Sequence, residues 1–152
     1  MQDPIKSYEE LLVSDSYKDF IKKDPSAILI ACFLTNGEWQ FDFYSEGKVT
    51  IFKNNKLEIK DEILNPQSVI KKLDLKNIKI KAEKAIEIAR EKLKIHKDET
   101  DKRIVLLQNF KEKPAWNITL LTKNMNIMNL KINALNGDII GESFESIFKL
   151  KV

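Results

Sequence analysis

The stretch that most constrains this fold lies at residues 114–140 and reads PAWNITLLTKNMNIMNLKINALNGDII. From Trp116, apolar and polar residues alternate, which is the pattern of a strand with one buried face. The alternation resumes at Leu130 after a polar break. Asn136-Gly137 then supplies the left-handed backbone of a tight hairpin, because glycine has no Cβ to clash there. The stretch therefore predicts an antiparallel meander.

A similar stretch occurs at residues 39–59, which read WQFDFYSEGKVTIFKNNKLEI. Residues 39–45 align with residues 116–122 without a gap, in the shared order tryptophan, amide, apolar, polar, apolar, apolar, hydroxyl. The strands beyond do not keep the same phase, so the repeat rests on the positions around the tryptophans. We predict an internal duplication in which Trp39 and Trp116 both lie in the core of their own copy.

Composition limits the classes of protein to which the chain belongs. Its 152 residues are 43% hydrophobic, enough for a core in one domain or in two small ones packed together. The 26 basic and 23 acidic residues leave a net charge of +3, too small and too dispersed to predict a nucleic-acid-binding surface. The longest apolar run, residues 27–34, is too short for a membrane span. The single cysteine, Cys32, excludes an internal disulfide, fits a reducing compartment and is expected to be buried.

Capping and turn residues divide the first half into a helix and four strands. We expect the helix from Ser7 to Lys23, capped by Ser7, with a weak point at residues 13–16 where it breaks into two pieces. A four-stranded antiparallel meander should follow, with turns that contain glycine or asparagine. The strands are expected at residues 27–34, 38–45, 48–53 and 56–60.

The second half repeats this order. Pro66 opens an expected short helix that ends at Leu73, and residues 74–79 lead to the next element. Residues 81–95 are the strongest helix of the sequence, because an alanine-rich apolar face recurs at the helical period. A strand at residues 103–110 then enters the meander described above, and the C-terminal stretch is either an edge strand or a tail over the core.

These elements predict an α+β fold made of tandem units, each a helix followed by an antiparallel meander, with two sheets packed with helices. The first strand of each half, at residues 27–34 and 103–110, is apolar on both faces, so both of its faces should be covered. Whether the units pack as one globule is left open. The expected boundaries are residues 1–64 for the first unit, 65–80 for a linker with the short helix, and 81–152 for the second unit.

Three segments of the second half match a known family: KAEKAIEIA at residues 81–89, PAWNI at 114–118 and INALNGDII at 132–140. They resemble the PepSY family, small modules of thermolysin-like metalloprotease propeptides and of germination and membrane-associated bacterial proteins. Asn133 and Asn136 stand where that family usually has aspartate and threonine. The resemblance implies PepSY- or cystatin-like units, the first more diverged. It also implies a non-catalytic module that inhibits or chaperones peptidases, outside the cytoplasm if a leader was removed and otherwise cytoplasmic.

The residues themselves favour binding over catalysis. General acid–base catalysis needs positioned groups with tuned pKa values, usually a histidine or paired carboxylates. The one histidine, His96, follows the strongest helix, where the helix dipole explains it, and no second ligand lies near it in the sequence. We therefore expect no catalytic residues, no cofactor and no metal site.

A protein or peptide partner is the expected ligand, bound at an open sheet edge or on the polar alternate positions of the tryptophan strands. The alternative is a small-ligand-binding α+β domain with a pocket between helix and sheet. The oligomeric state is left open. The candidate binding residues are Gln40, Asp42, Tyr44, Asn117, Thr119 and Leu121.

Overall fold

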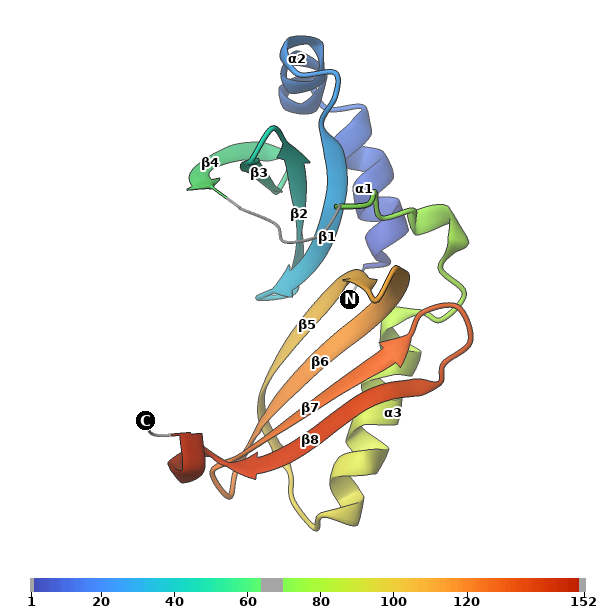
Figure 1. The fold of residues 1–152 in the computed structure, drawn as a ribbon, viewed down its shortest axis with the longest axis vertical. Helices are drawn as coiled ribbons and strands as arrows, with labels where there is room; N and C mark the ends of the chain where they lie inside the picture. Colours follow the sequence, from blue (N-terminus) through green and yellow to red (C-terminus); the bar gives the residue numbers. More distant parts are fainter. Residues whose placement is uncertain (1, 64–69, 151–152) are drawn as a thin grey trace. The chain divides into compact units, whose positions relative to one another are not determined.

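The structure is a computed structural model and describes residues 2–63 and 70–150. They form two units, Met1–Lys76 and Asn77–Val152. Each unit contains a helical segment followed by a four-stranded antiparallel meander (Figure 1). The α+β class predicted from the sequence is confirmed.

Two short helices open the first unit, α1 (Pro4–Leu12) and α2 (Asp15–Lys23). Ser14 separates them, because its hydroxyl accepts a hydrogen bond from the backbone N–H of Tyr17 at 3.3 Å and so begins a new helix. The break predicted at residues 13–16 is confirmed.

The predicted helix start at Ser7 is wrong. The helix begins three residues earlier, where the side chain of Asp3 accepts a hydrogen bond from the N–H of Ile5 at 2.9 Å. Pro4 follows in the first helical turn, where its missing N–H removes no hydrogen bond. An aspartate followed by proline is a stronger start signal than a serine inside the first turn.

The strands of the first unit follow one another in a sheet of order β4-β3-β2-β1. All three connections are two-residue hairpins in which both residues have positive φ, as a type I′ turn requires. The last of them, Asn54-Asn55, has φ values of 53° and 57°. The strands are β1 (Ile28–Thr35), β2 (Glu38–Ser45), β3 (Lys48–Lys53) and β4 (Lys56–Ile63).

The connection between the units differs from the prediction. Part of the helix expected at residues 66–73 lies outside the described residues, and its described part, residues 70–73, is not helical. The backbone N–H of Leu73 instead donates to the carbonyl of Leu29 in β1 at 2.8 Å. This tertiary hydrogen bond outweighs local helix propensity, and a short 3₁₀ turn, η1 (Leu75–Asn77), follows.

In the second unit a single helix, α3 (Ala82–Ile95), lies along one face of the sheet (Figure 1). The predicted helix at residues 81–95 is thus confirmed. Its buried residues are the alanines and aliphatics of one stripe, and the sheet order is β5-β6-β7-β8. The C-terminal stretch is an edge strand, which ends in a 3₁₀ turn, η2 (Ile147–Leu150). The strands are β5 (Thr100–Phe110), β6 (Lys113–Thr122), β7 (Asn126–Asn133) and β8 (Ile139–Ser146).

The expectation that both first strands are covered on both faces is wrong for β5 and holds at only one position on the second face of β1. In β1 the neighbours Ala31 and Cys32 point to opposite faces and are both buried. In β5, Ile104 is 41% exposed, whereas Val105 on the other face is fully buried. In β5, apolar residues at both alternating sets of positions therefore did not predict that both faces are buried.

The two tryptophans make the same contact in the two units. The indole N–H of Trp39 in β2 donates to the carbonyl of Gln2 at 2.7 Å, and that of Trp116 in β6 donates to the carbonyl of Ile80 at 2.8 Å. Gln2 and Ile80 each lie one residue before the N-cap of the helix that follows. Both tryptophans are buried, at 4% and 0% exposure, so their predicted core positions are confirmed.

Candidate functional site

Each sheet has one face that packs against the helices of its own unit and one that none of the described helices of that unit covers (Figure 1). We call the second the open face. In unit 2 the strand period places Trp116 and Ile118 on the helix face, so the residues between them lie on the open face. Register then adds residues from the neighbouring strands. The open face of unit 2 comprises Ile104, Leu106, Asn117, Thr119, Leu121, Ile127, Asn129 and Lys131.

A hydrogen-bonded ladder of polar side chains occupies the centre of this face. Asn129 lies opposite Thr119 on the adjacent strand, and its side-chain amide donates to the hydroxyl of Thr119 at 3.0 Å. The same amide donates to the side-chain oxygen of Asn117 at 2.6 Å. Lys131 donates to the side-chain oxygen of Asn129 at 2.9 Å. The ladder therefore pairs its polar groups internally while remaining half-buried.

Apolar side chains flank the ladder. Ile104 is 41% exposed, and Leu106, Leu121 and Ile127 are half-buried. The open face thus combines apolar contact area with polar groups that already have partners.

Two of the three sequence candidates in this unit, Asn117 and Thr119, belong to the ladder, and Leu121 lies beside it. Sequence reasoning missed Asn129, the residue that joins them, and Lys131. The missing signal was the register of the β6–β7 hairpin, since only the register places β7 residues opposite named β6 residues.

The open face of unit 1 carries the other three candidates, Gln40, Asp42 and Tyr44, all half-buried. The side-chain amide of Gln40 donates to the carboxylate of Asp42 at 2.9 Å. Their neighbours on β1 and β3 include Ala31 and Ile51, which are buried at 8% and 4% exposure. The structure therefore places all six candidates on open faces, three on each sheet, and brings each set of three together on one strand.

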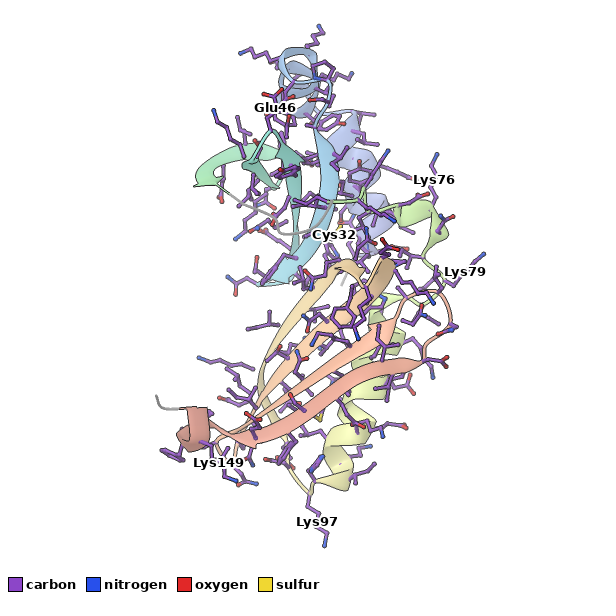
Figure 2. All side chains as sticks on the ribbon, viewed as in Figure 1. Cys32, Glu46, Lys76, Lys79, Lys97 and Lys149 are labelled. Atoms are coloured by element: carbon purple, nitrogen blue, oxygen red, sulfur yellow. The ribbon has the colours of Figure 1, made fainter. Side chains whose placement is uncertain are left out.

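The thiol of Cys32 is buried in unit 1 (Figure 2). Burial raises its pKa well above the ordinary value, and the charge of Asp42 adds to the rise. Burial also raises the pKa of Tyr8 to about 12, with further contributions from Tyr17 and Cys32. A thiol with a raised pKa is a poor nucleophile, so this group contributes packing and not reactivity.

A corner at the start of α3 explains the family-like segments of unit 2. The carbonyl of Ala134 accepts hydrogen bonds from the backbone N–H groups of Lys79 and Ile80, both at 2.9 Å. The carbonyl of Ile80 in turn accepts the indole N–H of Trp116. Backbone and indole hydrogen bonds thus hold the helix start against two strands, and the role of these segments is structural.

The loop between β7 and β8 differs from the tight hairpin predicted at Asn136-Gly137. It spans residues 134–138, and of the two predicted turn residues only Gly137 has a positive φ, 84°. The side-chain oxygens of Asn133 and Asn136 each accept a hydrogen bond from the backbone N–H two residues ahead, at 2.8 and 2.9 Å. Aspartate and threonine offer the same kind of acceptor, which accounts for asparagine at these positions.

Asp98 organises the opposite end of unit 2. Burial raises the pKa of this carboxylate, but hydrogen bonds from the side chains of Thr122 and Asn126 and from the backbone N–H groups of Glu99 and Asn124 outweigh it and lower the pKa to about 2. The side-chain amide of Asn126 lies 2.9 Å from the carboxylate. Asp98 is therefore an ionised acceptor that fixes the turn between β6 and β7, and sequence reasoning did not single it out.

Within the residues that the structure describes, no group of three or more histidine, cysteine, aspartate or glutamate side chains is arranged to hold a metal ion. His96 stacks on the ring of Phe144, with ring centroids 3.8 Å apart and an angle of 4° between the planes. Among the described helices, none has the length and hydrophobicity required to span a bilayer.

Residues 79–142 match the family model described as the peptidase propeptide and YPEB domain, PepSY. This segment, less than half of the chain, is similar to PepSY domains. The resemblance predicted for the second half is thereby confirmed, and unit 1 lies outside the matched range. No curated protein matches the chain.

A solved structure has a similar fold, a protein of Clostridium difficile 630 described as "a putative lipoprotein". Its TM-score is 0.60 at 19% identity, and the alignment covers 86% of this chain and 91% of that one. At this identity the likeness concerns the fold alone. Because it covers more than the PepSY domain, it extends into unit 1.

Proposed function

We propose that this chain is a non-catalytic protein- or peptide-binding module and that the open face of unit 2 contacts the partner. The observation that carries the proposal is the ladder centred on Asn129, which is flanked by the exposed side chain of Ile104. A partner that covers this face buries apolar area, and the internal hydrogen bonds of the ladder limit the desolvation penalty. The PepSY match supports a partner that is a peptidase or its substrate, because the description of the family names peptidase propeptides.

The edge strand β8 offers a second way to bind a protein or peptide partner. It lies at the end of the sheet, so its outward backbone groups are available to an added strand. A partner segment that pairs with β8 continues the sheet, and its side chains then alternate onto the open face. Strand addition and open-face contact are therefore compatible in one complex.

Selection of peptides from a random library on the immobilised chain tests this function. Selected peptides should bind with micromolar affinity, and Ile104→Glu should weaken binding about tenfold or more by placing a charge in the contact. Lys84→Glu is a matched control, because Lys84 is exposed on α3, on the other side of the sheet. An unchanged affinity in Ile104→Glu, or no peptide bound at micromolar concentration, contradicts the proposal. The same variants can be compared as inhibitors of a thermolysin-like metallopeptidase.

We propose small-ligand binding as a second candidate function, restricted to unit 1. In unit 2 the residues between α3 and the sheet, including Trp116, Ile118 and Leu120, are fully buried. In unit 1 a cavity of about 220 Å³ lies beside Trp39, and residues of α1 and β2 line it. A cavity bordered by a helix and a strand supports this second candidate.

Two further proposals concern origin and location. The matching indole hydrogen bonds of Trp39 and Trp116 support an internal duplication in which unit 1 is the diverged copy. The PepSY match and the description of the Clostridium protein as a lipoprotein support a location outside the cytoplasm. Fractionation of cells that express the full-length gene product tests the location, and recovery in the cytoplasmic fraction would contradict it.

A further inference from the structure

The cavity beside Trp39 has a polar and acidic lining. It holds about 220 Å³ and lies between α1 and the β3–β4 turn at residues 54–55. Trp39 and Phe41 are its buried aromatic residues. Its other lining residues are Gln2, Ser7, Glu10, Gly37, Glu38, Asn54 and Asn55.

In unit 2 the loop after the third strand contacts the helix start. There the N–H of Ala134 donates to the carbonyl of Pro114, and its carbonyl accepts from Lys79 and Ile80, all at 2.9 Å. Ala134 is fully buried. One residue, with one donor and one acceptor, thus closes the corner between the tryptophan strand and the helix start.

Unit 1 has no such residue because its loop is shorter. Five residues, 134–138, connect β7 to β8, whereas only Asn54 and Asn55 connect β3 to β4. The two-residue turn borders the cavity. Unit 1 therefore has no loop residue in the role of Ala134, and a cavity borders its two-residue turn instead.

The lining indicates which chemistry fits this space. Glu10 and Glu38 contribute two carboxylates, and none of the lining residues that the structure describes is basic, although the whole chain carries a net charge of +3. The indole of Trp39 borders the cavity but is only 4% exposed, so the two carboxylates carry most of the attraction for a cation. Both glutamates are exposed, so the attraction is moderate and depends on salt.

We propose that the cavity beside Trp39 binds a basic side chain, lysine or arginine, presented by a polypeptide partner. The ammonium or guanidinium group pairs with Glu10 and Glu38, and the adjacent peptide groups find the amides of Asn54 and Asn55. The inference rests on the second candidate function of unit 1. It does not depend on whether the open face of unit 2 binds a partner.

The probe for this site is Nα-acetyl-lysine methylamide, titrated into the ¹⁵N-labelled chain at millimolar concentration while the two indole N–H signals are followed by NMR. The Trp39 signal should shift and saturate, whereas the Trp116 signal should stay in place. Nα-acetyl-glutamine methylamide, which lacks the charge, should cause no saturable shift. Equal shifts with both compounds, or no shift of Trp39, would overturn the proposal.

The double variant Glu10→Gln/Glu38→Gln keeps side-chain shape and removes both charges. It should abolish the saturable shift of Trp39. The matched control Glu83→Gln/Glu91→Gln changes two exposed glutamates of α3 and should bind as the parent does. Retained binding in the first variant, or lost binding in the control, contradicts the assignment. Equal shifts of Trp39 with the lysine and the glutamine compound would leave small-ligand binding by unit 1 standing, whereas no shift with either compound would contradict both.

Discussion

Unit 1 and unit 2 share the contact between a tryptophan and a helix start, yet they surround it differently. In unit 1, aromatic rings fill the space between helices and sheet: Phe20 lies 5.3 Å from Phe52 and 5.8 Å from Phe43, centroid to centroid. In unit 2 the residues around Trp116 are aliphatic, and Ala134 closes the corner. The same backbone arrangement thus tolerates two kinds of core.

The difference teaches which parts of the unit specify the fold. Two short helices replace one long helix in unit 1, and a two-residue turn replaces a five-residue loop. The indole hydrogen bond persists through both changes. It fixes a strand to a helix start in each unit, and its loss would leave a buried indole N–H without that acceptor.

Replacement of Trp116 by alanine should have the largest effect. Trp116 is fully buried in a closed corner, so Trp116→Ala should lower the free energy of unfolding of unit 2 by about 3–5 kcal/mol. Trp39→Ala should cost less, because Trp39 borders a cavity. The free energy of unfolding of each unit, obtained from urea denaturation that is monitored by hydrogen exchange, gives both losses. A larger loss for Trp39→Ala would contradict the expected difference between the two units.

Glycine-to-alanine substitutions should have the next largest effect on stability, and the effect should differ between the two units. Gly137 has a φ of 84°, and an added Cβ would lie 3.4 Å from the side chain of Ile80. Gly137→Ala should therefore cost about 1–2 kcal/mol. Gly37 has a φ of 78° but no atom within 4 Å of an added Cβ, so Gly37→Ala should cost less. Equal losses would indicate that the loop of unit 2 does not press on the helix start.

The side-chain hydrogen bonds on the two open faces should differ in their contribution to the free energy of unfolding, but by a smaller amount. Asn129→Ala removes the donor to Asn117 and Thr119 and should cost about 1 kcal/mol. Gln40→Ala removes one hydrogen bond to Asp42 and should cost less. In a Thr119→Val background the loss from Asn129→Ala should shrink, and an unchanged loss would contradict coupling within the ladder.

The acid dependence of the stability of unit 2 should rest in part on Asp98. The pKa of Asp98 is lowered to about 2, so its stabilising contribution is present above the ordinary carboxyl range, roughly pH 4, and is lost as the pH falls toward 2. Asp98→Asn should remove this part of the acid dependence. Thermal unfolding of both proteins between neutral and acidic pH measures it. Parallel curves would show that Asp98 is not held ionised.

Much of this fold was predictable because local signals agreed with one another. Alternation and turns that contain glycine or asparagine predicted the strands, and the alanine-rich stripe predicted α3. The helix start at Asp3 was missed although the capping signal was present. The burial of β5 was misjudged, because exposure of Ile104 depends on what covers the sheet and not on the residue itself.

The candidate site was predictable only in part. Strand period alone placed Asn117 and Thr119 on the same face. The role of Asn129 required the hairpin register, and the acidic cavity beside Trp39 required the difference in loop length between the units. Neither is encoded in a local pattern, since both arise from contacts between segments distant in sequence.

Hydrogen exchange of the two indole N–H groups, followed by NMR, tests the central claim most directly. If each unit is built on the hydrogen bond from its tryptophan to the carbonyl before the helix, both Trp39 and Trp116 should be strongly protected and should exchange only when their unit opens. An indole that exchanges as fast as free tryptophan in the folded protein would contradict the shared corner, and with it the proposed duplication.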